Sequence, residues 1–336
     1  MAAFARARYK LARFRVMQPL RPVVLERRLV QKPWGGRALA ECPGIPLPAE
    51  QMIGESWELY DRPDGSSEIR EGGTLHELLA ADMRGVLGAR VAATRDGRFP
   101  LLLKFIDARE RLSVQVHPGD EQARKHDDSG KSEGWVVLHA GPRASIVRGF
   151  RAGTTRAQVE AAAHAGAAIE GLLHSFTPKV GDVIPVPPGV VHAIGPDVVV
   201  FEVQQNSDLT FRFWDWGSGR ELHVREALEA VRVGDEGPPT VVPTPIDARG
   251  EWLLRTPQFR VRRLRFDSPA TIGTEGSYKV MVVVDGMAAI GWRSGGEHPP
   301  IPLRSGETLL VPAAVSAIFV SPIGPMTCFW IDGERG

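Results

Sequence analysis

The sequence predicts an all-β chain built from two similar barrels with a small helical segment. Short apolar runs such as PLLLKFIDA, GWVVLHA, DVVVFEVQ and YKVMVVVDG recur along the 336 residues, between 36 glycines and 27 prolines. Runs of this length between turn residues are typical of strands in barrels and sandwiches. An internal repeat, in which GDVIPVPPGVVHAI from Gly181 aligns with GETLLVPAAVSAIF from Gly306, indicates that one strand–turn–strand unit occurs twice.

The repeat divides the chain into two domains, joined near the proline- and charge-rich segment DEGPPTVVPTPIDARGE. We expect a first barrel over residues 17–235 and a second barrel over residues 236–336. In the repeat alignment His192 stands opposite Ala317. A chemical role for this histidine would therefore belong to the first barrel, and the second should be metal-free. The basic residues 1–16 lack the continuous apolar stretch of a signal peptide, so we expect a disordered extension there.

Three segments have helical patterns. They are TLHELLAADMRGVLGA with Thr74 as its N-cap, a segment around 154–174 with Thr154 or Thr155 as its N-cap, and VREALEAV. Threonine accepts a hydrogen bond from the first helical turn, which is why it marks helix starts.

Composition excludes several classes of partner. A formal net charge of +1 gives no general reason to bind nucleic acid or a membrane surface, and no apolar run reaches the length of a membrane-spanning helix. Cys42 and Cys328 stand near opposite ends of the chain, which fits neither a disulfide framework nor a thiolate metal site. We expect a soluble cytoplasmic protein with a small-molecule ligand. Whether it is a monomer or a homodimer stays open.

The segment SVQVHPGD places two polar side chains on one face of a strand. Alternate residues of an extended strand point the same way, so Gln115 and His117 share a face while Val114 and Val116 point to the other. Such a pair is either two hydrogen-bonding residues inside a barrel or half of a metal site.

A second motif favours the metal site. Gly181, Pro187, Gly189 and His192 have the spacing of the second motif of the cupin superfamily, and this resemblance implies jelly-roll barrels, a bicupin, with His192 as a metal ligand. The first cupin motif would supply two histidines one residue apart and then a glutamate. Here Gln115 takes the place of the first histidine.

Several separately spaced segments resemble the type I phosphomannose isomerases. They are KPWGG, IGESWEL, PLLLKFIDA, LSVQVHPGDEQA, GKSEGWVVL, PPGVVHAIG and EVQQNSDLTFRFWDWG, spread between Met17 and Val231. The resemblance implies a zinc-dependent aldose–ketose isomerase that interconverts mannose 6-phosphate and fructose 6-phosphate through an enediol.

The resemblance also implies a ligand set for one zinc ion: Gln115, His117, Glu133 and His192. Imidazoles and a carboxylate suit a borderline divalent ion, and the absence of thiolates argues against a closed structural zinc site. Taken alone, each histidine would be read as a hydrogen-bonded strand residue and Glu133 as a solvated loop acid. The combined pattern favours the metal.

Further pocket residues follow from the same resemblance. Lys131 is expected as general acid or base, with Asp208 and a water molecule on the metal as alternatives. Arg212 would stabilise charge or bind phosphate; its alternative is a structural ion pair with Asp208 or Asp215. The remaining substrate- or phosphate-binding residues are expected to be Lys104, Ser113 and Asn206. Lys104 interrupts an apolar strand and so needs a charged partner, for which a phosphate would serve.

Three other functions compete with this prediction. A cupin oxygenase would hold iron in a histidine-rich set, which Gln115 and a basic pocket disfavour. A sugar-phosphate-binding bicupin without turnover would keep the metal and lose catalysis. A purely structural bicupin would bind no metal and tolerate replacement of His192.

Overall fold

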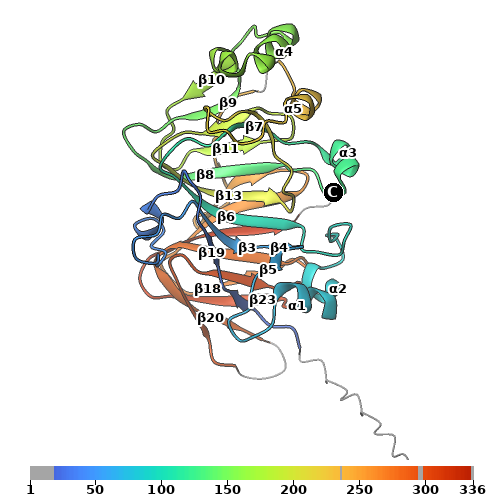
Figure 1. Ribbon diagram of the computed structural model, residues 1–336. Helices are drawn as coiled ribbons and strands as arrows, with labels where there is room; N and C mark the ends of the chain where they lie inside the picture. The colour runs from blue at the N-terminus through green and yellow to red at the C-terminus, as the bar shows by residue number, and fades with distance from the viewer. Residues whose placement is uncertain (1–18, 235–236, 294–297, 334–336) are drawn as a thin grey trace, which may run out of the picture.

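Antiparallel β-sheets make up most of the fold, so the all-β prediction is confirmed (Figure 1). The structure is a computed structural model that describes residues 19–234, 237–293 and 298–333. The predicted disordered extension, residues 1–16, lies outside the described residues. Within the described part of the chain, no helix is both long and apolar enough to cross a membrane.

The first barrel consists of two facing sheets. The six-stranded sheet has the order β11 (Val183–Val186), β8 (Glu133–Ala140), β13 (Val198–Gln205), β6 (Leu101–Ala108), β3 (Glu55–Leu59) and β2 (Arg28–Val30). The five-stranded sheet has the order β10 (Leu173–Phe176), β9 (Ile146–Phe150), β12 (His192–Ile194), β7 (Val114–Val116) and β14 (Phe211–Trp214).

The second barrel repeats this arrangement with a seven-stranded and a four-stranded sheet. The larger has the order β1 (Val23–Leu25), β22 (Thr308–Val311), β19 (Lys279–Asp285), β24 (Met326–Gly333), β17 (Phe259–Phe266), β16 (Gly250–Arg255) and β15 (Thr244–Pro245). The smaller has the order β18 (Ala270–Gly273), β23 (Ala317–Pro322), β20 (Met287–Trp292) and β21 (Ile301–Arg304). A two-stranded hairpin comprises β4 (Asp61–Arg62) and β5 (Gly65–Ser66).

The sequence repeat corresponds to a structural repeat. β11 and β22 occupy equivalent places and are followed by Pro187 and Pro312. The next strands, β12 and β23, begin at His192 and Ala317. The expected difference between the barrels is therefore present at the same structural position.

One predicted domain boundary needs correction. The strand β1, which belongs to the first domain in sequence, pairs with β22 in the seven-stranded sheet of the second barrel. A strand near the start of the described chain therefore completes a sheet formed otherwise by residues 244–333.

The helices are short and few. They are α1 (Leu75–Ala81), α2 (Met83–Leu87), α3 (Asp120–Ala123), α4 (Arg156–His164) and α5 (Val224–Ala230), with 3₁₀ turns η1 (Ala38–Ala40), η2 (Arg124–His126) and η3 (Gly166–Leu172). The caps at Thr74 and Thr155 are confirmed: each side-chain oxygen accepts a hydrogen bond from the N3 backbone N–H. The predicted helix over 154–174 is interrupted after His164, where η3 replaces the α-helix.

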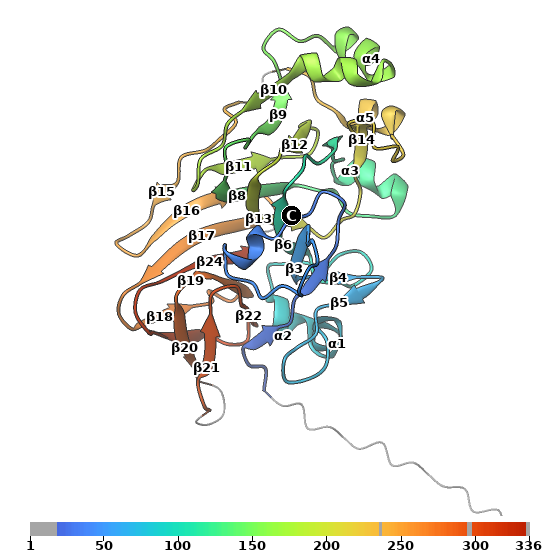
Figure 2. The same ribbon diagram turned by 60° about the vertical axis from the view of Figure 1, so that its left-hand side comes forward.

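The four main sheets stack in layers (Figure 2). Helices α4 and α5 pack on the outer face of the five-stranded sheet. The six- and seven-stranded sheets share a large core, in which Phe201 of β13 stacks on Phe329 of β24 with ring centroids 4.8 Å apart. The six-stranded sheet is therefore covered on both faces, which accounts for its nearly continuous apolar strands.

Strand alternation places the polar residues of the six-stranded sheet inside the first barrel. Leu103 and Phe105 of β6 point into the core shared with the second barrel, so Lys104 between them points the other way. The same alternation brings Glu202 of β13 directly opposite Lys104. The interior of the first barrel thus receives charged side chains from an otherwise apolar sheet.

Candidate metal centre and substrate pocket

Two buried histidines face each other inside the first barrel. His117 and His192 are each 1% exposed, and their ring centroids lie 4.7 Å apart. The Nδ1 atom of His117 lies 2.8 Å from the carbonyl oxygen of Leu209, and that of His192 lies 2.9 Å from the carbonyl oxygen of Val190. A carbonyl only accepts, so both Nδ1 atoms carry the proton and both Nε2 lone pairs face the cavity.

Glu133 completes a cluster that could hold a metal ion. Its Oε1 lies 3.3 Å from Nε2 of His192, its Oε2 lies 3.4 Å from Nε2 of His117, and one ligand atom of each residue lies within 4.8 Å of the others. The histidines come from the five-stranded sheet and Glu133 begins β8 of the six-stranded sheet. The candidate centre therefore bridges the two sheets of the barrel.

Burial and charge determine the protonation states in this cluster. Burial and then the Lys131 ammonium lower the pKa of His117 to about 3, and burial lowers the pKa of His192. Burial alone would raise the pKa of Glu133, but Lys131 and the histidines outweigh it and hold that pKa well below its ordinary value. Neutral imidazoles beside a carboxylate are the forms that bind a divalent metal.

Gln115 lies beside these three residues. Its Nε2 is 3.2 Å from Nε2 of His192 and 3.5 Å from Nε2 of His117, while Ser113 donates a hydrogen bond of 3.1 Å to its Oε1. Exchange of the two amide atoms by rotation would turn the oxygen toward the histidines and let the amide donate to Ser113. The side chain can thus offer a neutral oxygen ligand.

The residues present fit a metal ion. Both carboxylate oxygens of Glu133 are buried and have no hydrogen-bond partner within the described part of the chain. Buried polar atoms without a partner are costly. A metal ion bound by the two imidazole nitrogens would also give these carboxylate oxygens a partner. The fit to a metal ion therefore rests on the two Glu133 oxygens, because the histidine Nε2 atoms already lie 3.2 Å from nitrogens of Lys131 and Gln115.

Lys131 lies next to the centre. Its Nζ is 3.2 Å from Nε2 of His117 and 3.4 Å from Oε2 of Glu133, and its side chain is 8% exposed. The position directly before Ser132 and Glu133, where β8 begins, fixes the ammonium at the inner end of the cavity.

The cavity above the centre has a volume of about 670 Å³. This lies in the range of small-molecule sites. Of the expected site residues, those that line it are Lys104, Ser113, Gln115, Lys131, His192, Asp208 and Arg212. These predicted site residues therefore come from both sheets of one barrel and line a single cavity.

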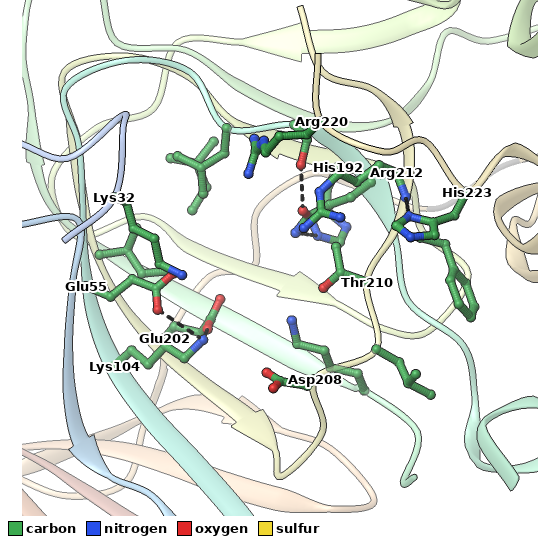
Figure 3. A pocket seen from close by; sticks show the side chains of 18 of the residues that line it. Lys32, Glu55, Lys104, His192, Glu202, Asp208, Thr210, Arg212, Arg220 and His223 are labelled. Carbon is green, nitrogen blue, oxygen red and sulfur yellow. Dashed lines mark hydrogen bonds and ion pairs between the residues drawn. The ribbon is translucent and has the colours of Figure 1, made fainter. Parts of the chain in front are cut away.

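One side of the cavity holds charges that already neutralise each other (Figure 3). Lys104 Nζ lies 3.7 Å from a Glu55 oxygen and 3.8 Å from a Glu202 oxygen, and Lys32 lies 3.3 Å from Glu55. Lys104 thus has two carboxylate partners within the protein, where the sequence argument had supplied a phosphate. Burial and then the Glu133 charge raise the pKa of Glu202 to about 7.

The other side of the cavity carries Arg212 and Arg220 (Figure 3). Arg220 is paired with Asp215 at 2.5 Å, and Asp208 lies 3.6 Å from Arg62. The alternative expectation, an ion pair of Arg212 with Asp208 or Asp215, is not met among the described residues. The Nε atom of Arg212 is buried without a partner, and burial together with Arg220 lowers its pKa.

Asp208 and Asn206 have different surroundings. Asp208 lines the cavity with a side chain that is 66% exposed. Asn206 is 2% exposed, lies outside the lining of this cavity, and donates hydrogen bonds to the carbonyl oxygens of Asp61 and Phe99. Both amide hydrogens of Asn206 therefore hold the backbone, and substrate binding by Asn206 stays a prediction.

Sequence reasoning missed several lining residues. Glu55 and Glu202 stand inside segments quoted for the family resemblance, and Glu202 interrupts an apolar strand as Lys104 does, which was the available signal for that residue. Other missed lining residues include Lys32, Trp57, His126, Thr210, Arg220 and His223. His126 ends the 3₁₀ turn η2, and its ring lies 5.4 Å from that of Phe211.

Comparison with known proteins agrees with this site. The family profile "Phosphomannose isomerase type I, catalytic domain" matches residues 23–145. A mannose-6-phosphate isomerase of Streptococcus mutans is 30% identical over 88% of this chain and 94% of its own length. Mannose-6-phosphate isomerase ManA of Bacillus subtilis is 32% identical over 87% and 93%.

A solved structure extends the similarity to nearly the whole fold. The crystal structure of a mannose 6-phosphate isomerase from Bacillus subtilis aligns with a TM-score of 0.81 and 28% identity, covering 93% of this chain and 99% of that one. Both barrels are therefore shared. The chain belongs to the type I phosphomannose isomerase family.

Proposed function

We propose that the chain interconverts mannose 6-phosphate and fructose 6-phosphate as a zinc-dependent cytoplasmic enzyme. One observation carries the proposal: a buried His–Glu–His cluster with an adjacent lysine lies at the inner end of a polar cavity, and the cavity wall at strand β14 carries Arg212, which has no ion pair among the described residues. A metal centre for the sugar oxygens and a cationic wall for the phosphate suit a sugar phosphate.

The ligands would be His117, Glu133, His192 and Gln115. Three of them bind through groups already oriented by strand alternation and, for the histidines, by backbone carbonyls. Zinc held there would supply positive charge that stabilises the enediolate oxygen. No thiolate takes part, which suits a catalytic site with room for substrate.

The phosphate would bind on the side of Arg212 and Arg220, with Ser113 beside them. Burial and then the Arg220 guanidinium lower the pKa of Arg212, and a phosphate dianion beside Arg212 would oppose that effect. The Lys104 side is already neutralised by Glu55 and Glu202. We therefore assign Lys104 to orienting these carboxylates and the sugar hydroxyl groups.

The isomerisation moves one proton from C2 to C1 and one from O2 to O1, so the composition of the sugar is unchanged. Lys131 lies beside the centre and is our first choice for the acid or base. Asp208 and Glu202 are the alternatives in the same cavity. Glu202, with a pKa raised to about 7, is poised to accept and return a proton near neutral pH.

The test is a coupled assay for fructose 6-phosphate formed from mannose 6-phosphate. It compares zinc-replete protein, chelator-treated protein and the variant His192→Ala, with His164→Ala at the exposed end of α4 as a matched control. We expect turnover that requires metal and falls more than about 100-fold in His192→Ala, since loss of even a ligand's supporting partner costs 10–100-fold.

Two results would contradict the proposal. Bound metal without turnover would leave a sugar-phosphate-binding or oxygen-activating cupin. Full turnover in His192→Ala would exclude the metal centre from the reaction. Elemental analysis of the purified protein identifies the metal independently of activity.

A further inference from the structure

The loop of residues 206–209, here called the rim loop, links two parts of the site. It presents the Asp208 side chain at the cavity edge. Its Leu209 carbonyl oxygen accepts the hydrogen bond from Nδ1 of His117 at 2.8 Å. The position of this loop therefore determines both where Asp208 lies and how the His117 ring is oriented.

Arg62 of the β4–β5 hairpin contacts the rim loop from outside the cavity. Its Nη1 donates to the backbone oxygen of Asn206 at 3.0 Å and lies 3.3 Å from the Asn206 side-chain oxygen. Its Nη2 lies 3.6 Å from Asp208 and 3.5 Å from Asp128. The Arg62 side chain is only 11% exposed, and among the described residues its buried Nε has no partner.

Asp128 completes the connection. Its Oδ2 accepts a hydrogen bond of 3.1 Å from the backbone N–H of Asp208. Arg62 therefore pairs with two carboxylates at once and reduces the repulsion between them, one on the rim loop and one on the segment that leads into Lys131. Without this guanidinium, Asp128 and Asp208 would repel each other across the cavity edge.

The hairpin that carries Arg62 is itself fixed. Asp61 is fully buried and accepts from the backbone N–H of Phe99 at 3.0 Å and from Arg98 at 3.2 Å. Arg98 also donates to the carbonyl oxygen of Arg62 at 3.0 Å. Asn206 of the rim loop also contacts the hairpin, since its side-chain amide donates to the Asp61 carbonyl oxygen at 2.7 Å. A guanidinium on such a support can hold a loop in place.

We propose that Arg62 is a positioning residue for the reaction: it holds the rim loop so that Asp208 faces the substrate and the Leu209 carbonyl orients His117 toward the metal. The role of Asp208 in this inference rests on the proposed function, and the orientation of His117 rests on the candidate metal centre. Arg62 lies beside the separate hollow of about 370 Å³ that Asn206 lines, so it acts through the rim loop and does not touch substrate.

A stabilising ion pair alone would behave differently. Asp208 is two-thirds exposed, and exposed ion pairs add little to folding stability. Loss of the Arg62–Asp208 pair by itself should therefore change the melting temperature little. It should change zinc affinity and catalysis much more, because groups that orient a ligand typically affect metal affinity or activity 10–100-fold.

The experiment compares Arg62→Ala, Arg62→Lys and Arg95→Ala. Arg95 is an exposed arginine on the wall of the same hollow and forms no ion pair with a described residue, so it controls for loss of charge. Each protein is stripped of metal, and its zinc dissociation constant is measured by competition with a chromophoric chelator. The kcat and KM for mannose 6-phosphate are measured on zinc-saturated protein, with thermal unfolding beside them.

We expect Arg62→Ala to weaken zinc binding about tenfold and to lower kcat more than it changes KM, with Arg95→Ala unchanged. Arg62→Lys should recover part of both, since an ammonium can reach one carboxylate but cannot replace a planar fork with several donors. A zinc constant and kcat equal to wild type in Arg62→Ala, or equal losses in Arg95→Ala, would overturn the proposal.

If Arg62→Ala unfolds, a second variant tests the positioning role of Arg62. Asp128→Asn keeps the side-chain size and removes one of the two charges that Arg62 holds, and unaltered zinc affinity in this variant would overturn the proposal. If the wild-type chain itself shows no isomerase turnover, the proposed function fails. The zinc measurement still tests the positioning of His117.

Discussion

At the scale of single residues, the partner of a charge decides what it can do. Lys104 and Arg212 were both expected to meet phosphate. Lys104 lies between Glu55 and Glu202, whereas Arg212 forms no ion pair with a described residue and has a buried Nε without a partner. A substrate anion should therefore bind more favourably at Arg212 than at Lys104, because Lys104 would first have to leave its two carboxylate partners.

The Arg212 assignment predicts the effect of a substitution that preserves charge. Arg212→Lys should lower kcat/KM about 10²–10³-fold, as loss of one donor to a developing charge does, because a lysine cannot reproduce the planar fork. Steady-state assays with Arg156→Lys on helix α4 as control would measure it. A change of less than about threefold, with metal content intact, would remove Arg212 from the site.

Residue positions were predictable where strand alternation alone decides them. Val114 and Val116 pack under the helices while Gln115 and His117 face the cavity, as the period of two requires. Glu55 and Glu202 were missed because their role depends on which strands pair. Glu202 stands opposite Lys104 through the β6–β13 register, and Glu55 approaches the same lysine from the neighbouring strand β3.

At the scale of elements, local signals predicted where helices start better than where they end. The cap at Thr155 marks the start of α4, but the predicted segment breaks near Gly166, which has φ +63° and so leaves the right-handed helical region. Asp82 divides the first predicted helix in the same way, since its side chain accepts from the N–H of Gly85 and starts α2. The alanine-rich pattern on its own does not reveal such breaks.

The N-cap of α4 gives a prediction with a built-in control. Thr155 accepts from the N–H of Gln158, which reaches back to the Thr155 N–H in a capping box. Thr155→Ala should destabilise the helix by about 0.5–2 kcal/mol, whereas Thr154→Ala should have little effect. Amide hydrogen exchange within residues 156–164 would measure the difference. Equal protection in both variants would show that the cap adds nothing to the helix.

At the scale of the whole molecule, the two barrels are fused and not merely joined by a linker. The repeat predicted two copies of one unit. It could not show that the six- and seven-stranded sheets bury their faces against each other, or that β1 crosses into the second barrel. Such long-range pairing leaves no local pattern, because an apolar strand has the same composition whichever sheet covers it.

The shared core predicts that both barrels unfold in one transition. Phe329 of β24 is 1% exposed and stacks on Phe201 of the first barrel. Phe329→Ala should lower the free energy of unfolding by about 3–5 kcal/mol. The substitution should destabilise the first barrel, which holds the candidate metal centre, as well as the second barrel, because the cavity left by the Phe329 ring adjoins both sheets.

Two probes can follow the barrels separately in denaturant. Release of zinc added to the candidate centre would report on the first barrel. In a Cys42→Ser background, the thiol of Cys328 reports on the second: it is fully buried, and burial raises its pKa to about 12, so it should react with a thiol reagent only after unfolding. We expect both midpoints to shift together in Phe329→Ala. A shift of the thiol midpoint alone would mean that the second barrel opens while the metal centre stays folded, and the two barrels would then be independent folding units.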